Sequence, residues 1–142
     1  MKHGSKLIVN YDRSIEDSLI AGKYDNKHDN ITGKNFPSSK KGKKKVDFRM
    51  FYFNKGMLSE NVISKMKKVG YHPATMNELL AFGEKNPKLQ RKFSIAALGS
   101  VAEINGLLCV GFLDGSDSKR DVDMYAFDLE WFSSCRFLAV RN

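Results

Sequence analysis

The chain has 142 residues, of which 42% are hydrophobic and 28% are charged, as in an ordinary globular protein. This length predicts one domain with one core. No stretch has the roughly 18 consecutive apolar residues of a membrane span, and the first residues lack the apolar segment of a secretion signal. We therefore expect a protein of the cytoplasm, or one displayed through a partner, with no signal peptide or transmembrane segment.

The formal net charge is +8, but the charge is divided unevenly along the chain. Residues 1–92 contain 20 Lys and Arg against 9 Asp and Glu, whereas residues 93–142 contain 4 against 7. The basic part includes a cluster that could attract a phosphate backbone. It consists of Lys40, Lys41, Lys43, Lys44 and Lys45. The cluster lacks the interleaved aromatic residues of a single-strand binder. We therefore keep nucleic-acid binding only as the alternative interpretation.

The N-terminal third predicts a strand, a short helix and a polar loop. Residues 6–10 are typical of a strand, and Ser14 is placed to cap a helix over 15–21 that ends at Gly22. Residues 23–45 are polar and predict a solvated loop. We interpret residues 1–45 as an extension that packs on a core domain of residues 46–142.

Two helices are predicted in the core domain. Ser59 is placed to cap the first, which should end at Gly70. Thr75 and Glu78 have the spacing of a capping box, in which each side chain accepts a hydrogen bond from a free backbone N–H of the first turn. This second helix should end at Gly83, and a short helical turn should follow at 89–92.

Alternating or continuous apolar residues predict the strands of the core domain. Residues 46–53 alternate in the manner of a strand, and residues 136–140 form a last apolar strand. Residues 95–101 and 107–113 predict a hairpin, since the Asn105-Gly106 pair between them suits the positive φ angles of a tight turn. A segment of more than twenty residues, rich in Asp, Ser and Gly, then precedes the last strand and predicts a long irregular loop, which is often functional.

No catalytic or metal-binding constellation is predicted. His3, His28 and His72 are far apart with no cue that brings them together, and Cys109 and Cys135 lack a neighbour that would activate a thiol. We expect reduced, separate cysteines, since a single pair does not make a disulfide framework. We accordingly expect neither an enzyme nor a protein with a metal or cofactor.

Residues 121–135 have the composition of a binding loop. Aromatic side chains alternate there with aspartates and serines, and rigid aromatics give contact area at a low entropic cost. The alternative interpretation is that these aromatics only fill the core, which we expect for Phe127 and Trp131.

Three segments resemble a known family. They are GYHPATMNELLAFG at 70–83, IAALGSV at 95–101 and W-x-x-x-C-RFLAVR at 131–141. Together and in this order they resemble the variable target proteins of diversity-generating retroelements, whose C-type-lectin-like fold is related to that of formylglycine-generating enzymes. The resemblance covers roughly residues 46–142.

The resemblance implies an α+β fold of the C-type-lectin type. It consists of two helices packed on a small, mostly antiparallel sheet, with a long loop-rich C-terminal segment. The first and last core strands, residues 46–53 and 136–141, should pair. The oxidase cysteines and the calcium-ligand motifs of related families are missing, which argues against catalysis and calcium-dependent sugar binding.

The resemblance also implies a mechanism of diversification for a variable region at about 112–135. Mutagenic reverse transcription turns AAC or AAT codons into any NNC or NNT codon, and such codons do not encode Lys, Glu, Gln, Met or Trp. Met124, Glu130 and Trp131 should therefore be fixed scaffold. Arg136 and Phe137, at the start of the last strand, are also expected to be scaffold. The expected ligand-facing residues are Asp121, Asp123, Tyr125, Ala126, Asp128, Phe132, Ser133, Ser134 and Cys135. The expected partner is a macromolecule, most simply a protein.

Overall fold

A large sheet is the main layer of the molecule. The computed structural model describes residues 5–142, and in that part eight strands form one mixed sheet, in the order β1-β3-β8-β5-β6-β7-β2, with β4 paired to β8. The strands are β1 (Ser5–Asn10), β2 (Asn26–Lys27), β3 (Lys43–Tyr52), β4 (Tyr71–Pro73), β5 (Ile95–Ile104), β6 (Leu107–Ser116), β7 (Lys119–Ala126) and β8 (Arg136–Arg141). The helices are α1 (Ile15–Ala21), α2 (Ser59–Lys68), α3 (Met76–Lys85) and α4 (Leu89–Lys92).

This architecture corrects the predicted fold class. The expected α+β fold, with two helices on a small sheet and a long C-terminal loop, is wrong, because the sheet has eight strands and four helices accompany it within residues 5–142. Strands β1 and β2 come from the part predicted to be an extension, and β7 occupies the segment predicted to be irregular. Only residues 127–135 remain a loop between β7 and β8.

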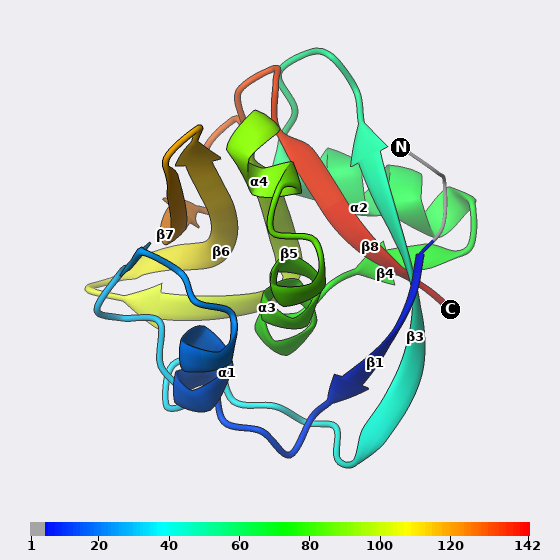
Figure 1. Cartoon of the computed structure of the whole chain (residues 1–142). Helices are drawn as coiled ribbons and strands as arrows, with labels where there is room; N and C mark the ends of the chain where they lie inside the picture. The colour runs from blue at the N-terminus through cyan, green and yellow to red at the C-terminus, as the bar shows by residue number, and fades with distance from the viewer. Residues whose placement is uncertain (1–4) are drawn as a thin grey trace.

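The sheet separates two hydrophobic cores. Alternate residues of its strands contribute to different cores: Leu138 and Val140 of β8 lie in the first, whereas Phe137 and Ala139 lie in the second. The first core also contains residues of α1 and α3, and the second contains residues of α2 and Trp131. In Figure 1, α1, α3 and α4 accordingly lie in front of the sheet and α2 lies behind it.

The pairing expected between the first and last core strands is present. Strands β3 and β8 are antiparallel, with Phe48 opposite Val140 and Tyr52 opposite Arg136. On its other side β8 runs parallel to the start of β5. Strand β8 therefore joins the two halves of the sheet, as its central position in Figure 1 shows.

The predicted hairpin between β5 and β6 is confirmed. Asn105 and Gly106 have φ angles of 51° and 82°, the positive values that a two-residue turn of this kind requires. The pairing register shifts between Ala97 and Ala102, so β5 bulges away from β6 at this point. The bulge brings Gly99 against the end of β4, where its N–H donates to the carbonyl of Ala74 at 2.8 Å.

The helix boundaries were predicted in part. Helix α1 has the expected bounds, and the Ser14 side chain caps it by accepting a hydrogen bond from the N–H of Asp17. Helix α2, however, is preceded by Leu58 as its cap, and Ser59 is already helical. Helix α3 has the predicted capping box but continues past Gly83 to Lys85. At Gly83 an added Cβ would collide with the Tyr24 hydroxyl, so this glycine provides space and does not end the helix.

The N-terminal residues are part of the first core. Val9, Tyr11, Ile15 and Leu19 are at most 5% exposed within it. The expected division between residues 45 and 46 falls inside β3, whose residues 43–48 pair with β1. The part of the chain before residue 46 therefore completes the sheet and covers one of its faces.

Candidate functional site

Strand β7 turns its polar residues to one face of the sheet. Asp121, Asp123 and Tyr125 alternate with Val122 and Met124, which pack in the first core. The three polar residues therefore lie on the face of the second core, where the helix α2 and the 127–135 loop cover only part of the sheet. The side chain of Asp123 is exposed, and those of Asp121 and Tyr125 are half-buried.

An aromatic cluster adjoins these residues. The rings of Tyr125 and Trp131 are tilted against each other with centroids 4.3 Å apart. Phe132 lies 6.1 Å from both rings and 6.5 Å from Phe112. Trp131 is 1% exposed whereas Phe132 is 39% exposed, so the cluster has a buried base and an open edge.

Hydrogen bonds fix the loop that carries Trp131. The indole N–H of Trp131 donates to the Ser59 hydroxyl at 2.9 Å, and that hydroxyl donates to the carbonyl of Phe127 at 2.8 Å. The backbones of Trp131 and Met57 exchange hydrogen bonds in both directions. The hydroxyl of Tyr125 donates to the carbonyl of Glu130 at 2.7 Å. The loop is thus held in place before any partner binds.

Carboxylates face one another across β6 and β7. Asp114 of β6 lies directly opposite Asp121 of β7, and Phe112 lies opposite Asp123. Each carboxylate of the Asp114–Asp121 pair accepts one hydrogen bond from a neutral group, from Ser94 and Asn26 respectively. The ion pairs found within residues 5–142 involve neither of them.

We call this region the acidic–aromatic surface. It comprises two aspartates and the tyrosine of β7, the aspartate opposite them on β6, and three consecutive exposed loop residues. Its members are Asp114, Asp121, Asp123, Tyr125, Phe132, Ser133 and Ser134. Because its polar groups stand on a strand and on a fixed loop, the surface can present preformed hydrogen-bond acceptors beside an exposed ring.

Not all of the expected ligand-facing residues belong to this surface. Ala126 alternates with Tyr125 and so lies on the opposite side of the strand. Asp128 is exposed beside the start of α2, where Leu58 and Phe127 line a small cavity of about 120 Å³ with it. Cys135 is 1% exposed within the second core, so its expected contact with a ligand is wrong.

The two cysteines are separate thiols with different environments. Burial raises the pKa of the Cys135 thiol to about 12, and the hydrogen bond to the backbone of Ala96 and the charge of Arg136 only partly oppose this effect. Cys109 is half-buried on β6. Cys135 is therefore a neutral core side chain at ordinary pH.

The residues expected to be scaffold lie beneath or beside the surface. Met124 is partly buried against the first core, and Phe137 is 2% exposed in the second. The Arg136 guanidinium lies 3.6 Å from the ring centroid of Tyr52 and 4.2 Å from that of Phe93, so it stacks between two aromatic side chains.

Other expected features occupy different places. His28 lies near β2 and His72 lies on β4, whereas His3 is outside the described residues. Within residues 5–142, no group of three or more His, Cys, Asp or Glu side chains is arranged to hold a metal ion. Over the same range, no helix is both long and apolar enough to cross a membrane. Of the lysine cluster, Lys43, Lys44 and Lys45 lie on β3 and not in the predicted loop.

Three residues of the site were not among the expected ligand-facing or scaffold residues, although Phe112 and Asp114 lie inside the predicted variable region of about 112–135. Asp114 and Phe112 join it through the register of β6 and β7, which depends on pairing that no local pattern reveals. Ser59 anchors Trp131, although its position had indicated a helix cap. The alternation of Val122 and Met124 with polar residues was the available signal for β7.

No protein-family model, curated protein or solved structure matches the chain. These comparisons therefore assign the chain to no family.

Proposed function

We propose that the protein is a binding module whose acidic–aromatic surface recognises a basic patch on a partner protein. The observation that carries the proposal is the unbalanced pair of Asp114 and Asp121, on the same strand face as the Phe112 ring that adjoins the exposed ring of Phe132. Like charges directly opposite each other on neighbouring strands destabilise a sheet. A partner that supplies lysine or arginine side chains would remove this repulsion and cover the ring.

The exposed ring supplies the second part of the recognition. Aromatic side chains with a buried base and a polar rim are typical energetic centres of protein interfaces. Phe132 is supported from below by Trp131 and flanked by Ser133 and Ser134, both of which are exposed. Because the loop is already ordered, binding would not have to order it first.

We further propose that this surface is diversified by mutagenic reverse transcription. This step rests on the resemblance of the three segments, together with the exposure of residues that NNC or NNT codons can encode. Asp123, Phe132, Ser133 and Ser134 are all exposed and all accessible to such codons. Trp131, which is outside that codon set, is buried beneath them.

The binding proposal can be tested by selecting random peptides on the immobilised full-length chain. The selected peptides should be rich in Lys and Arg, and their affinity should fall at least tenfold for Phe132→Ala, which corresponds to about 1.4 kcal/mol. Ile20→Ala is the matched control, because Ile20 is 75% exposed on α1, on the other side of the sheet. Peptides without basic residues, bound equally well by both variants, would contradict the proposal.

Neutralising the carboxylates separates binding from stability. The double variant Asp121→Asn/Asp123→Asn should lose the selected basic peptides while its free energy of unfolding in urea rises by about 0.5 kcal/mol, since cross-strand repulsion is relieved. If these aspartates served only the fold, peptide affinity would not fall while the free energy of unfolding rises. An unchanged affinity together with lower stability would count against the assignment.

Diversification has an independent test in the DNA around the gene. We expect a near copy of its 3′ end close to a reverse-transcriptase gene, with mismatches confined to adenines of the copy. They should fall at the codons of the exposed residues and spare that of Trp131. Absence of such a copy would remove the diversification step and leave the binding proposal standing.

A further inference from the structure

Two cavities meet at Lys40, away from the acidic–aromatic surface. The first has a volume of about 240 Å³ and lies where residues 35–40 cross the start of α3 and the bulge of β5. The second has a volume of about 280 Å³ and lies between the start of β3 and the end of β8. Tyr11 and Lys40 line both, so the two cavities are neighbouring lobes around one ammonium group.

The first lobe, which we call the polar lobe, contains a buried amide with free hydrogen-bonding capacity. Asn77 is 6% exposed and lines this lobe, and its side chain makes no hydrogen bond to residues 5–142. The neighbouring N–H groups of α3 are occupied, since that of Met76 donates to Ser100 and that of Glu78 donates to Thr75. Its amide atoms are not among the fully buried polar atoms that lack a partner, so they face solvent in the lobe and are free to hydrogen-bond a ligand there.

The second lobe, which we call the basic lobe, has an excess of positive charge. Lys44, Lys45 and Arg141 line it with Lys40, and Asp47 is the carboxylate among its lining residues. The ion pairs found within residues 5–142 leave Lys44, Lys45 and Arg141 without a carboxylate partner. His72 also lines this lobe, with Nδ1 within 2.7 Å of the Asn142 amide oxygen.

Lys40 connects the two lobes. Its ammonium lies 3.4 Å from Glu78 Oε2 and 5.4 Å from the centroid of the Tyr11 ring. Glu78 is fully buried and also accepts hydrogen bonds from the Tyr11 hydroxyl and the N–H of Thr75. The Lys40 side chain is 38% exposed and lines both lobes, so a ligand in either lobe can contact it.

We propose that the two lobes form one site for a small organic phosphate monoester. The phosphate would bind in the basic lobe, whose lining includes Lys44, Lys45 and Arg141, while the polar organic part would reach past Lys40 to Asn77. Each lobe is smaller than the roughly 300–1,000 Å³ of common ligand pockets, which favours a compact ligand divided between them. A nucleic-acid chain would use the lysines but would make no use of the Asn77 amide in the polar lobe.

Glycerol phosphate is the probe, with inorganic phosphate and glycerol as its separate parts. In two-dimensional NMR spectra of the full chain, glycerol phosphate should shift the backbone amides of Asn77 and Ser100 as well as those of Lys44 and Lys45. Its dissociation constant should be at least about tenfold lower than that of inorganic phosphate, because only the ester contacts both lobes.

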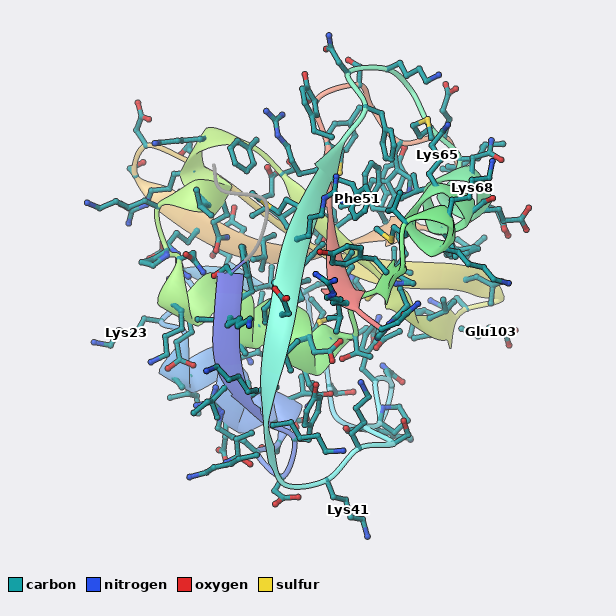
Figure 2. The ribbon with its side chains drawn as sticks, turned by 90° about the vertical axis from the view of Figure 1, so that its right-hand side faces the viewer. Lys23, Lys41, Phe51, Lys65, Lys68 and Glu103 are labelled. Atoms are coloured by element: carbon teal, nitrogen blue, oxygen red, sulfur yellow. The ribbon has the colours of Figure 1, made fainter. Side chains whose placement is uncertain are left out.

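Two variants test the lobes separately. Asn77→Ala should raise the dissociation constant of glycerol phosphate to that of inorganic phosphate without changing the latter, and it should fold normally because Asn77 has no hydrogen bond to lose. Lys44→Met/Lys45→Met should weaken both ligands about tenfold or more. Lys41→Met is the matched control, since Figure 2 shows Lys41 pointing into solvent just before the start of β3.

Three outcomes would overturn the proposal. The first is equal affinity for glycerol phosphate and inorganic phosphate with no effect of Asn77→Ala, which would indicate a simple anion patch. The second is tighter binding of a short single-stranded oligonucleotide that falls steeply with salt and ignores Asn77→Ala, which would indicate nucleic-acid binding. The third is the absence of shifts at the polar lobe with millimolar glycerol phosphate.

Discussion

Arg120 ties three segments of the chain together at the scale of a single residue. It is 4% exposed, and its guanidinium donates to the carbonyls of Gly22 at 2.6 Å and Gly83 at 2.8 Å. It also lies 4.6 Å from the ring centroid of Tyr24. Burial raises the pKa of Tyr24, more than the positive charge of Arg120 lowers it. One side chain thus holds α1, α3 and β7 against one another.

Replacing this guanidinium should therefore destabilise the whole protein. Arg120→Met leaves two carbonyls without their donor, and we expect the free energy of unfolding in urea to fall by about 2–4 kcal/mol. Lys119→Met, at the exposed neighbouring position, should change it by less than about 0.5 kcal/mol. Equal losses in both variants would show that the hydrogen bonds of Arg120 contribute little.

Burial also controls the reactivity of Cys135. At pH 8 iodoacetamide should modify Cys135 more than about tenfold more slowly than Cys109. A thiol with a pKa of about 12 has little thiolate at this pH, and the thiolate is the form that reacts. Urea should make both thiols reactive, as peptide mapping by mass spectrometry would show. Fast modification of Cys135 in the folded protein would contradict its place in the core.

The same thiol affects stability at high pH. Its pKa is raised in the folded state from an ordinary value of 9.0, so folding favours the neutral thiol. This contribution is fully present below about pH 9 and is lost as the pH rises towards 12. Cys135→Ala would remove this part of the alkaline loss of stability.

At the scale of elements, the start of α3 combines a local and a long-range interaction. The Thr75 hydroxyl accepts a hydrogen bond from the N–H of Glu78, and the Glu78 carboxylate accepts one from the N–H of Thr75 and another from the Tyr11 hydroxyl. Burial and the contact with Glu78 raise the pKa of Tyr11. The capping box therefore attaches the helix to the N-terminal segment as well as capping its first turn.

Thr75→Ala should cost about 1 kcal/mol of unfolding free energy, as removal of a cap commonly does. Urea unfolding followed by circular dichroism would measure this loss. Thr75→Ser retains the hydroxyl and should recover most of it. If the serine variant were as unstable as the alanine variant, the methyl group of Thr75 would be the important feature, and not the cap.

The elements that were predicted correctly depend on local chemistry. The Asn105-Gly106 turn, the Ser14 cap and the Thr75 capping box each follow from neighbouring residues. Strand β7 was missed because its polar face resembles a loop and its first inward residue is the buried Arg120. Within the site, Asp123 and Phe132 were predicted from composition, whereas the burial of Cys135 depends on contacts across the fold.

At the scale of the whole molecule, both ends of the chain contribute to one sheet. Strand β3 pairs with β1 on one side and with β8 on the other. The parallel pairing of β2 with β7 ties the N-terminal segment to the far edge as well. A domain limited to residues 46–142 would lose β1, β2 and part of β3, together with the core side chains that precede β3.

We therefore expect a chain of residues 46–142 not to fold alone. Removing Val9, Tyr11, Leu19 and Phe36 exposes the apolar side of α3 and of the sheet. The shortened chain should lack the cooperative thermal transition of the full chain in calorimetry. A cooperative transition with the dispersed amide spectrum of a folded protein would show that the extension is separable.

The buried Trp131 of the aromatic cluster is an intrinsic fluorescence probe of the acidic–aromatic surface. Trp131 is the single tryptophan of the chain, and it lies 1% exposed directly against Tyr125 and Phe132. All tryptophan fluorescence of the chain therefore comes from a ring that packs against Tyr125 and Phe132 of the acidic–aromatic surface. A partner that covers Phe132 would alter the polarity around this fluorophore. Binding to the unlabelled protein can therefore be followed by the wavelength and intensity of tryptophan fluorescence.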